Sequence, residues 1–209
     1  MPKRNILIKV CGMRDPENIK ELAGLPLNYI GHIFYPKSAR YVGNLSTLAD
    51  APGLKKTGVF VNASLSEITS AIKQYDLKVI QLHGDESPAL AKDLKGLGME
   101  VIKAFGIDEG FDWSKVAPFL DQVDYLLFDS KSAAYGGTGY TFNWEKLTSY
   151  PYEKPYFLSG GLSLENLSEA LAFDDARLVG LDLNSKFELE PGLKDIEKIK
   201  EALKTIHHE

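Results

Sequence analysis

Three short polar segments of the chain have the composition of phosphate-binding loops. They are Gly137, Thr138 and Gly139, then Gly160 and Gly161, and finally Asn184 and Ser185. Glycine lets backbone N–H groups approach an anion closely, and a helix that begins after such a segment adds the positive end of its dipole. One Gly-Gly pair alone is more often a tight turn. Three such segments together favour a site for a phosphoryl group.

Side chains that can transfer protons or bind carboxylates follow other apolar runs. Cys11, Arg40, His83 and Asp129 each come at or soon after the end of such a run. A thiol, an imidazole and a carboxyl group can serve as general acids or bases, and a guanidinium group pairs with a carboxylate in a planar fork. Structural roles are the alternative, because a lone cysteine is often a small buried side chain and an aspartate often caps a helix.

Strand-like and helix-like stretches alternate between these segments. The expected strands are Ile6–Val10, Tyr29–Phe34, Lys56–Val61, Lys78–Leu82, Glu100–Phe105, Tyr125–Phe128, Tyr156–Leu158 and Arg177–Leu181. Apolar residues at helical spacing predict helices that include Leu65–Tyr75, Leu164–Leu171 and Leu193–Ile206. Ser64 and Glu67 have the spacing of a capping box before the first of these helices.

Eight strands that alternate with helices predict a parallel sheet covered by helices. We therefore expect an α/β fold, a single (β/α)8 TIM-barrel domain over residues 1–209, with an open doubly wound sheet as the alternative. In such a barrel the carboxyl ends of all strands meet at one face, where active sites lie. The polar groups described above would then form one ring.

The composition limits the classes of function. The chain has 209 residues, 44% of them hydrophobic and 25% charged, which is ordinary for a globular domain. Its net charge of −5 and the lack of a Lys/Arg block argue against nucleic-acid binding. No apolar run suggests a membrane span or a signal peptide, and the single cysteine excludes an intramolecular disulfide. We expect a cytoplasmic protein, a monomer or homodimer, that acts on a small phosphorylated molecule.

The motifs of the chain resemble those of the phosphoribosylanthranilate isomerases of tryptophan biosynthesis. The matching segments are Lys9–Met13, Phe34–Ser38, Arg40–Val42, Gly58–Asn62, Gln81–Gly84, Asp129, Gly136–Gly139, Phe142–Trp144, Leu158–Leu162, Glu165–Asn166, Asp182–Ser185, Glu188, Pro191–Gly192 and Lys194–Asp195. They occur in order along nearly the whole chain. Four residues depart from the family pattern, in which Phe, Pro, Ser and Gly are usual: His32, Ala39, Asn184 and Lys186.

The resemblance implies an Amadori rearrangement that needs no metal or other cofactor. N-(5-phosphoribosyl)anthranilate would become 1-(2-carboxyphenylamino)-1-deoxy-D-ribulose 5-phosphate. By similarity, Asp129 is the general acid that protonates the ribose ring oxygen, and Cys11 is the general base that removes the C2′ proton. Arg40 is expected to pair with the anthranilate carboxylate, with His83 in the same pocket and Lys37 as a further cation.

Such an acid–base pair has an energetic problem. With reference values, about 3% of a cysteine is thiolate at pH 7 and about 0.1% of an aspartic acid is protonated. Both required forms coexist in a fraction on the order of 10⁻⁵, which adds about 6 kcal/mol to the barrier. The site must therefore favour one of the two forms. A neighbouring phosphate, thiolate or apolar wall would raise the pKa of Asp129. A cationic neighbour, for which Lys9 and Arg40 are the candidates, would lower the pKa of Cys11.

Competing functions have different requirements. A ribulose-phosphate epimerase would need metal-binding His and Asp residues at several strand ends, and an indoleglycerol-phosphate synthase would need a catalytic lysine pair and a longer N-terminal extension. A barrel that only binds ligands is a third alternative, against which Cys11 and Asp129 argue. A related aminoaldose of histidine biosynthesis undergoes the same rearrangement but carries two phosphates, and only one good phosphate site is evident in the sequence.

Overall fold

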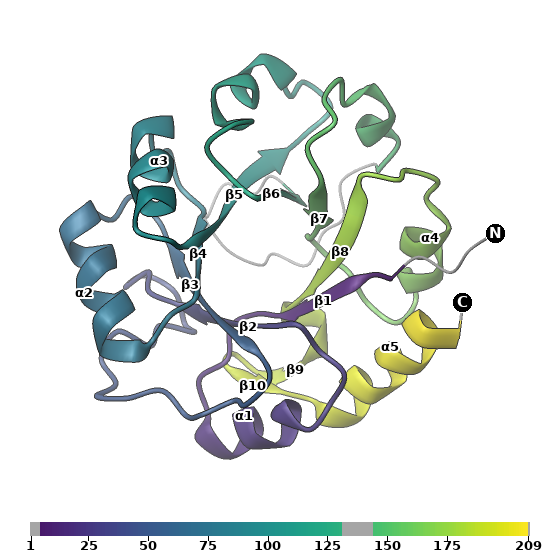
Figure 1. Ribbon diagram of the computed structural model, residues 1–209. Coiled ribbons are helices and arrows are strands. Elements are labelled where there is room, and N and C mark those ends of the chain that lie inside the picture. Colours follow the sequence, from purple (N-terminus) through teal and green to yellow (C-terminus); the bar gives the residue numbers. More distant parts are fainter. Residues whose placement is uncertain (1–4, 131–143, 209) are drawn as a thin grey trace.

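Eight parallel strands close into one barrel in the order of the sequence. The computed structural model describes residues 5–130 and 144–208. The barrel strands are β1 Leu7–Val10, β2 Tyr29–Ile33, β3 Lys55–Phe60, β4 Val79–Leu82, β5 Glu100–Ile107, β6 Tyr125–Ser130, β7 Tyr156–Leu158 and β8 Leu178–Leu183. They form a ring in Figure 1, with the helices outside it. The closed ring confirms the predicted fold class and rules out the open sheet.

The segments between strands are of several kinds. The α-helices are α1 Pro16–Ala23, α2 Leu65–Tyr75, α3 Pro88–Gly96, α4 Leu167–Ala172 and α5 Ile196–His208, and the 3-10 helices are η1 Trp113–Lys115, η2 Ala117–Phe119, η3 Trp144–Ser149 and η4 Ser185–Phe187. Residues 34–54 join β2 to β3 through turns rather than an α-helix. No helix in the described part of the chain is long and apolar enough to cross a membrane.

Side-chain caps fix the starts of three helices. The Ser64 hydroxyl accepts the N–H of Glu67, and the Glu67 carboxylate accepts the N–H of Ser64 at 2.8 Å. This capping box confirms the predicted start of α2, whose bounds agree with the expected ones. Asp15 and Ser87 cap α1 and α3 by accepting backbone N–H groups from the first turn.

The α4 helix begins at Leu167, three residues later than predicted. The side chain of Asn166 turns back before the helix, where its Oδ1 accepts the N–H of Ser163 at 2.8 Å and its Nδ2 donates to the carbonyl of Gly161 at 3.0 Å. These bonds hold the preceding residues in a turn. The sequence suggested that a helix begins directly after the Gly-Gly segment that follows β7. This prediction is wrong, because the turn separates the segment from the start of α4.

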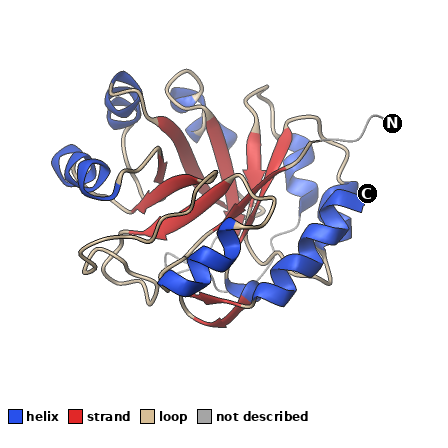
Figure 2. Cartoon of the chain, turned by 60° about the horizontal axis from the view of Figure 1, so that its bottom comes forward, coloured by secondary structure: helices blue, strands red, loops and turns tan. Residues whose placement is uncertain are grey.

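A small hairpin lies outside the barrel, between β8 and the last helix (Figure 2). Its strands, β9 Glu188–Glu190 and β10 Leu193–Lys194, pair in antiparallel fashion. Because Leu193 belongs to this hairpin, α5 begins at Ile196 and not at Leu193 as predicted.

The interior of the barrel changes from apolar to polar along the strands. One buried cluster is formed by Tyr29, Val79, Ile102, Ala104, Leu127 and Phe157. Successive side chains of a strand point to opposite faces, so every second residue faces the barrel interior. On β4 the inward series runs from Val79 to Gln81 and then His83, and on β6 it runs from Leu127 to Asp129. The polar end of this series is the carboxyl end of the strands.

Candidate active site

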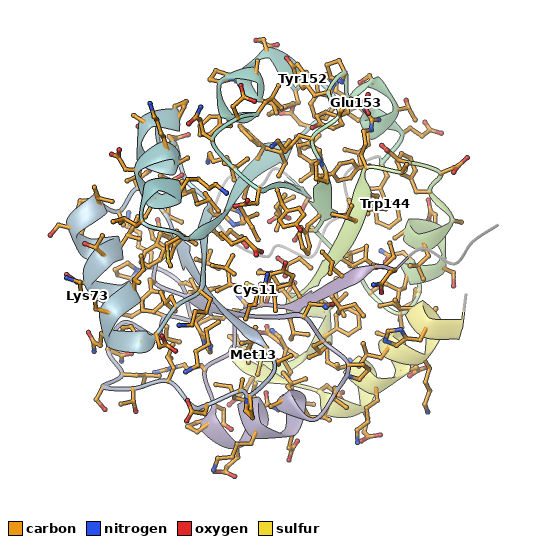
Figure 3. The ribbon with its side chains drawn as sticks, viewed as in Figure 1. Cys11, Met13, Lys73, Trp144, Tyr152 and Glu153 are labelled. Carbon is orange, nitrogen blue, oxygen red and sulfur yellow. The ribbon has the colours of Figure 1, made fainter. Side chains whose placement is uncertain are left out.

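A pocket lies at the carboxyl ends of the strands. It is lined by Cys11, Ile33, Tyr35, Ser38, Arg40, Val59, Val61, Gln81, His83, Asp129, Ser159, Asp182 and Asn184. The structure thus brings together Cys11, Arg40, His83 and Asp129, which the sequence had singled out. Figure 3 shows Cys11 near the middle of the ring. Among the described residues, no group of three or more His, Cys, Asp or Glu side chains is placed to hold a metal ion.

Cys11 is enclosed by backbone and charged side chains directly after β1. It is only 3% exposed, and a Cβ on Gly31 of β2 would lie 2.7 Å from its Sγ. Burial raises the pKa of the Cys11 thiol, and the nearby Lys9 is the strongest influence that lowers it. The predicted cation is therefore present. Burial outweighs the cation in this structure, so the net effect is a raised pKa of the Cys11 thiol.

Lys9 and Asp182 form an ion pair inside the barrel, next to Cys11. Lys9 Nζ lies 2.9 Å from Asp182 Oδ1 and 3.0 Å from Oδ2, and both side chains are buried. The two residues face each other in the register of β1 and β8. Burial opposes the charge on Lys9, but the Asp182 carboxylate raises the pKa of Lys9 above its usual value. The ammonium group is therefore held in its charged form.

Asp129 lies near the end of β6 and faces His83, the residue that follows β4. Its Oδ1 accepts the N–H of Ser130 at 2.8 Å, and its Oδ2 is 3.4 Å from His83 Nε2. The other ring nitrogen, His83 Nδ1, is 2.9 Å from Gln81 Nε2. With the Gln81 amide donating to Nδ1, the neutral ring carries its proton on Nε2. His83 then presents an N–H to the carboxyl group of Asp129.

Two of the three predicted phosphate-binding segments follow neighbouring strands, β7 and β8. Gly160 and Gly161 follow β7 with φ angles of 83° and 73°, and Asn184 and Ser185 follow β8, where Ser185 begins η4. For the N–H groups of Gly160 and Gly161, the structure shows no hydrogen-bond acceptor among residues 5–130 and 144–208. The third segment, Gly137, Thr138 and Gly139, lies outside the described residues.

Arg40 contacts a carboxylate of the β9–β10 hairpin. Arg40 Nε is 2.9 Å from Glu188 Oε1, and Nη2 donates to Oε2. Lys194 Nζ also donates to Glu188 Oε1, at 2.6 Å, and to Asn184 Oδ1, at 2.9 Å. Burial opposes ionisation of Glu188, but the hydrogen bonds from Arg40 and the charge of Lys194 lower its pKa. One edge of the guanidinium group is thus occupied by Glu188.

No role in the site was predicted from the sequence for Glu188 or Lys194. The available signal was their opposite charge on either side of the turn at Pro191 and Gly192, which brings them together in the hairpin. Lys37, expected as a further cation of the site, is exposed and does not line the pocket.

Comparison with known proteins points to one family. The model of the family described as N-(5'phosphoribosyl)anthranilate (PRA) isomerase matches residues 8–205. An N-(5'-phosphoribosyl)anthranilate isomerase of Parabacteroides distasonis is 45% identical over 208 residues, covering 97% of this chain and 94% of that protein.

Two solved structures support the same relationship. One, described as monomers of dimeric phosphoribosylanthranilate isomerase from Thermotoga maritima, has a TM-score of 0.81 at 29% identity and covers 98% of this chain and 100% of that one. The other is a phosphoribosyl anthranilate isomerase in complex with reduced 1-(o-carboxyphenylamino)-1-deoxyribulose 5-phosphate. Its TM-score is 0.78 at 28% identity, with 98% and 100% of the two chains covered.

Proposed function

Because the chain belongs to the N-(5′-phosphoribosyl)anthranilate isomerase family, we propose that it catalyses the Amadori rearrangement of N-(5′-phosphoribosyl)anthranilate in tryptophan biosynthesis. One observation carries the proposal: Cys11 and Asp129 line the same pocket although their strands, β1 and β6, are not neighbours. Two groups placed around one pocket can act on different atoms of a single sugar. The product is 1-(2-carboxyphenylamino)-1-deoxyribulose 5-phosphate.

The two residues divide the proton transfers between them. The carboxyl group of Asp129 donates a proton to the ribose ring oxygen as the C1′–O bond breaks, and the lone pair of the amine nitrogen forms a protonated imine. The Cys11 thiolate then removes the C2′ proton, and the released electron pair gives a neutral enolamine. The enolamine tautomerises to the ketone. Exchange with solvent returns a proton to Asp129 and removes one from Cys11.

The surrounding side chains suit the two ends of this substrate. The edge of Arg40 that Glu188 does not occupy can pair with the anthranilate carboxylate, and the His83 N–H can orient the Asp129 carboxyl group. Backbone N–H groups can hold the phosphate of the substrate. We assign this role to Gly160, Gly161, Asn184 and Ser185, together with Gly137, Thr138 and Gly139.

The proposed chemistry also bears on cofactors, location and assembly. Proton transfer within the substrate requires no metal or redox cofactor. A general base that must remain an unoxidised cysteine suits the reducing cytoplasm, so we propose a cytoplasmic enzyme that binds neither nucleic acid nor membranes. We propose a monomer or homodimer, which sedimentation equilibrium distinguishes.

The direct test is the decay of phosphoribosylanthranilate fluorescence after addition of the purified protein. We expect rapid decay with the unmodified chain. Cys11→Ala and Asp129→Asn should each lower kcat by about a thousandfold while circular dichroism stays unchanged. Asp121→Asn, an exposed carboxylate outside the pocket, is the control that should keep full activity. Absence of decay with the unmodified chain would refute the function, and near-normal turnover of either variant would remove that residue from the mechanism.

A further inference from the structure

The mechanism above leaves two buried charged side chains of the barrel interior, Lys9 and Asp182, without a role. We propose that Lys9 is a positioning residue that stabilises the Cys11 thiolate, with its ammonium group held in place by Asp182. The catalytic consequence of this inference rests on the proposed function. Its electrostatic basis concerns the protein alone and can be measured without substrate.

The Lys9 ammonium is bound by a carboxylate and lies on the same side of the chain as the buried Cys11 sulfur. Lys9 and Cys11 are two positions apart at the end of β1, so both side chains point into the barrel. Asp182 approaches from the neighbouring strand β8 and binds Lys9 Nζ through both oxygens. The charge of Lys9 acts directly on the buried Cys11 thiol, and Asp182 lines the same pocket as Cys11. Because Lys9 is completely buried, water does not weaken these contacts.

Two other cations act on Cys11, but both of them bind the same carboxylate. Lys194 from the β9–β10 hairpin and Arg40 from the segment after β2 each interact electrostatically with Cys11. Both also bind Glu188, which offsets part of their charge. Lys9 has a stronger effect on Cys11 than Lys194. The other titratable groups that line the pocket around Cys11 are Tyr35, His83, Asp129 and Asp182.

Asp182 has two opposing effects on the thiolate. Its negative charge disfavours a thiolate nearby, yet a buried lysine without a carboxylate partner tends to lose its proton. Although burial opposes the charge, Asp182 raises the pKa of Lys9 and so keeps the ammonium charged. Lys9 therefore acts as a fixed positive charge rather than as a proton donor. A fixed cation beside a buried sulfur offsets part of the cost of forming the thiolate.

The test uses the fact that Cys11 is the only cysteine of the chain, so alkylation reports on this thiol alone. The rate of reaction with iodoacetamide is measured against pH, together with the ultraviolet absorbance of the thiolate after subtraction of the Cys11→Ser spectrum. In Lys9→Met we expect the ionisation of Cys11 to move to higher pH by at least about one unit. This corresponds to roughly tenfold slower alkylation below that pH. An unchanged ionisation overturns the proposal.

A second buried lysine provides the matched control. Lys103 lies on β5, 3.1 Å from the buried Glu86 carboxylate, and does not appear among the charges that act on Cys11. Lys103→Met also removes a buried ion pair and leaves a carboxylate unpaired, but it should not move the ionisation of Cys11. An equal shift in this variant would mean that general loosening of the barrel is the cause.

The double variant Lys9→Met/Asp182→Asn separates loss of the cation from the effect of an unpaired carboxylate. We expect Cys11 still to ionise at higher pH than in the unmodified protein. If the double variant titrates like the unmodified protein, the unpaired Asp182 caused the shift and the proposal fails. Should these variants not fold, the reciprocal measurement on Cys11→Ser decides. By linkage, loss of the thiol should lower the pH at which Lys9 ionises, as followed by magnetic resonance of isotope-labelled lysine.

Failure of this inference and failure of the proposed function give different results. A shifted thiol ionisation without isomerase activity in the unmodified chain would refute only the function. Normal activity together with an unshifted thiol in Lys9→Met would refute only the role of Lys9.

Discussion

The guanidinium group of Arg40 and the carboxylate of Glu188 form a hydrogen-bonded ion pair, although the residues are 148 positions apart in the chain. Arg40 Nε lies 2.9 Å from Glu188 Oε1 and 3.0 Å from Oε2. The β9–β10 hairpin therefore fixes a cation of the pocket that originates after β2. A fixed guanidinium group loses little freedom when it pairs with a ligand carboxylate.

Glu188→Gln should weaken substrate binding more than it slows the reaction. The neutral amide cannot hold Arg40 in a charged fork, so we expect KM to rise roughly tenfold with a much smaller change in kcat. Steady-state kinetics with phosphoribosylanthranilate measure both values. Glu190→Gln, an exposed carboxylate of the same strand, is the control. An unchanged KM in Glu188→Gln would show that the fixed orientation of Arg40 does not matter for binding.

Gly160→Ala should abolish most activity by displacing the carboxyl group of Asp129. Gly160 has a φ of +83°, and a Cβ there would lie 2.4 Å from Ser130 N and 2.6 Å from Asp129 Oδ1. We expect kcat to fall at least about a hundredfold, because even small displacements of a catalytic group are costly.

Gly98→Ala is the matched control for this variant. Its φ of +80° imposes similar backbone strain, but nothing lies within 4 Å of the added Cβ. It should lose about 1 kcal/mol of unfolding free energy and keep full activity. Equal activity of the two variants would contradict the proposed crowding at Asp129.

His32 should make the protein less stable in mild acid. Burial lowers the pKa of His32 to about 4, and among the described residues its Nε2 has no hydrogen-bond partner. The unfolded chain takes up this proton near pH 6.5, so stability is lost as the pH falls from about 6.5 towards 4, by about 3 kcal/mol in all. Urea unfolding at neutral pH and at pH 4.5 measures the difference.

His32→Phe should reduce this loss, because Phe does not titrate. His207→Gln, at an exposed site in α5, should behave like the unmodified chain. If the drop in stability between the two pH values is the same in His32→Phe, the buried imidazole is not its source.

The pH profile of kcat/KM should be flat around neutrality and fall on the alkaline side. The active form needs a deprotonated Cys11 and a protonated Asp129, and the fraction of that form is constant between the two ionisations. Since burial raises the pKa of the Cys11 thiol, the flat region should extend further into alkaline pH than for an ordinary cysteine. In Lys9→Met the flat region should be lower and extend further still. A rate that rises steadily with pH would contradict the requirement for a protonated Asp129.

Much of the fold could be predicted from local sequence patterns. Buried parallel strands are continuous apolar runs, so the barrel strands were recognisable, and the capping box at Ser64 marked the start of α2. Strand ends were less accurate. Asp129 and Asp182 lie within β6 and β8, because the parallel pairing of the strands continues past the last apolar residues.

The contacts that set the chemistry of the site could not be predicted from local sequence patterns. The ion pair of Lys9 and Asp182 joins residues 173 positions apart, and nothing in the spacing of either strand indicates its partner. Position on one barrel face could be predicted for Cys11 and Asp129. The net pKa of Cys11 could not, because it depends on the balance between complete burial and a neighbouring cation.

The apolar cluster around Tyr29 and Phe157 restricts how substrate enters the barrel and how product leaves it. Those rings meet edge to face at 5.6 Å and fill the barrel below the polar pocket. Substrate cannot enter from that end, and product cannot leave through it. Arrival and departure must both use the end of the barrel that holds the polar pocket, so bound product blocks the next substrate, and product should inhibit the enzyme competitively.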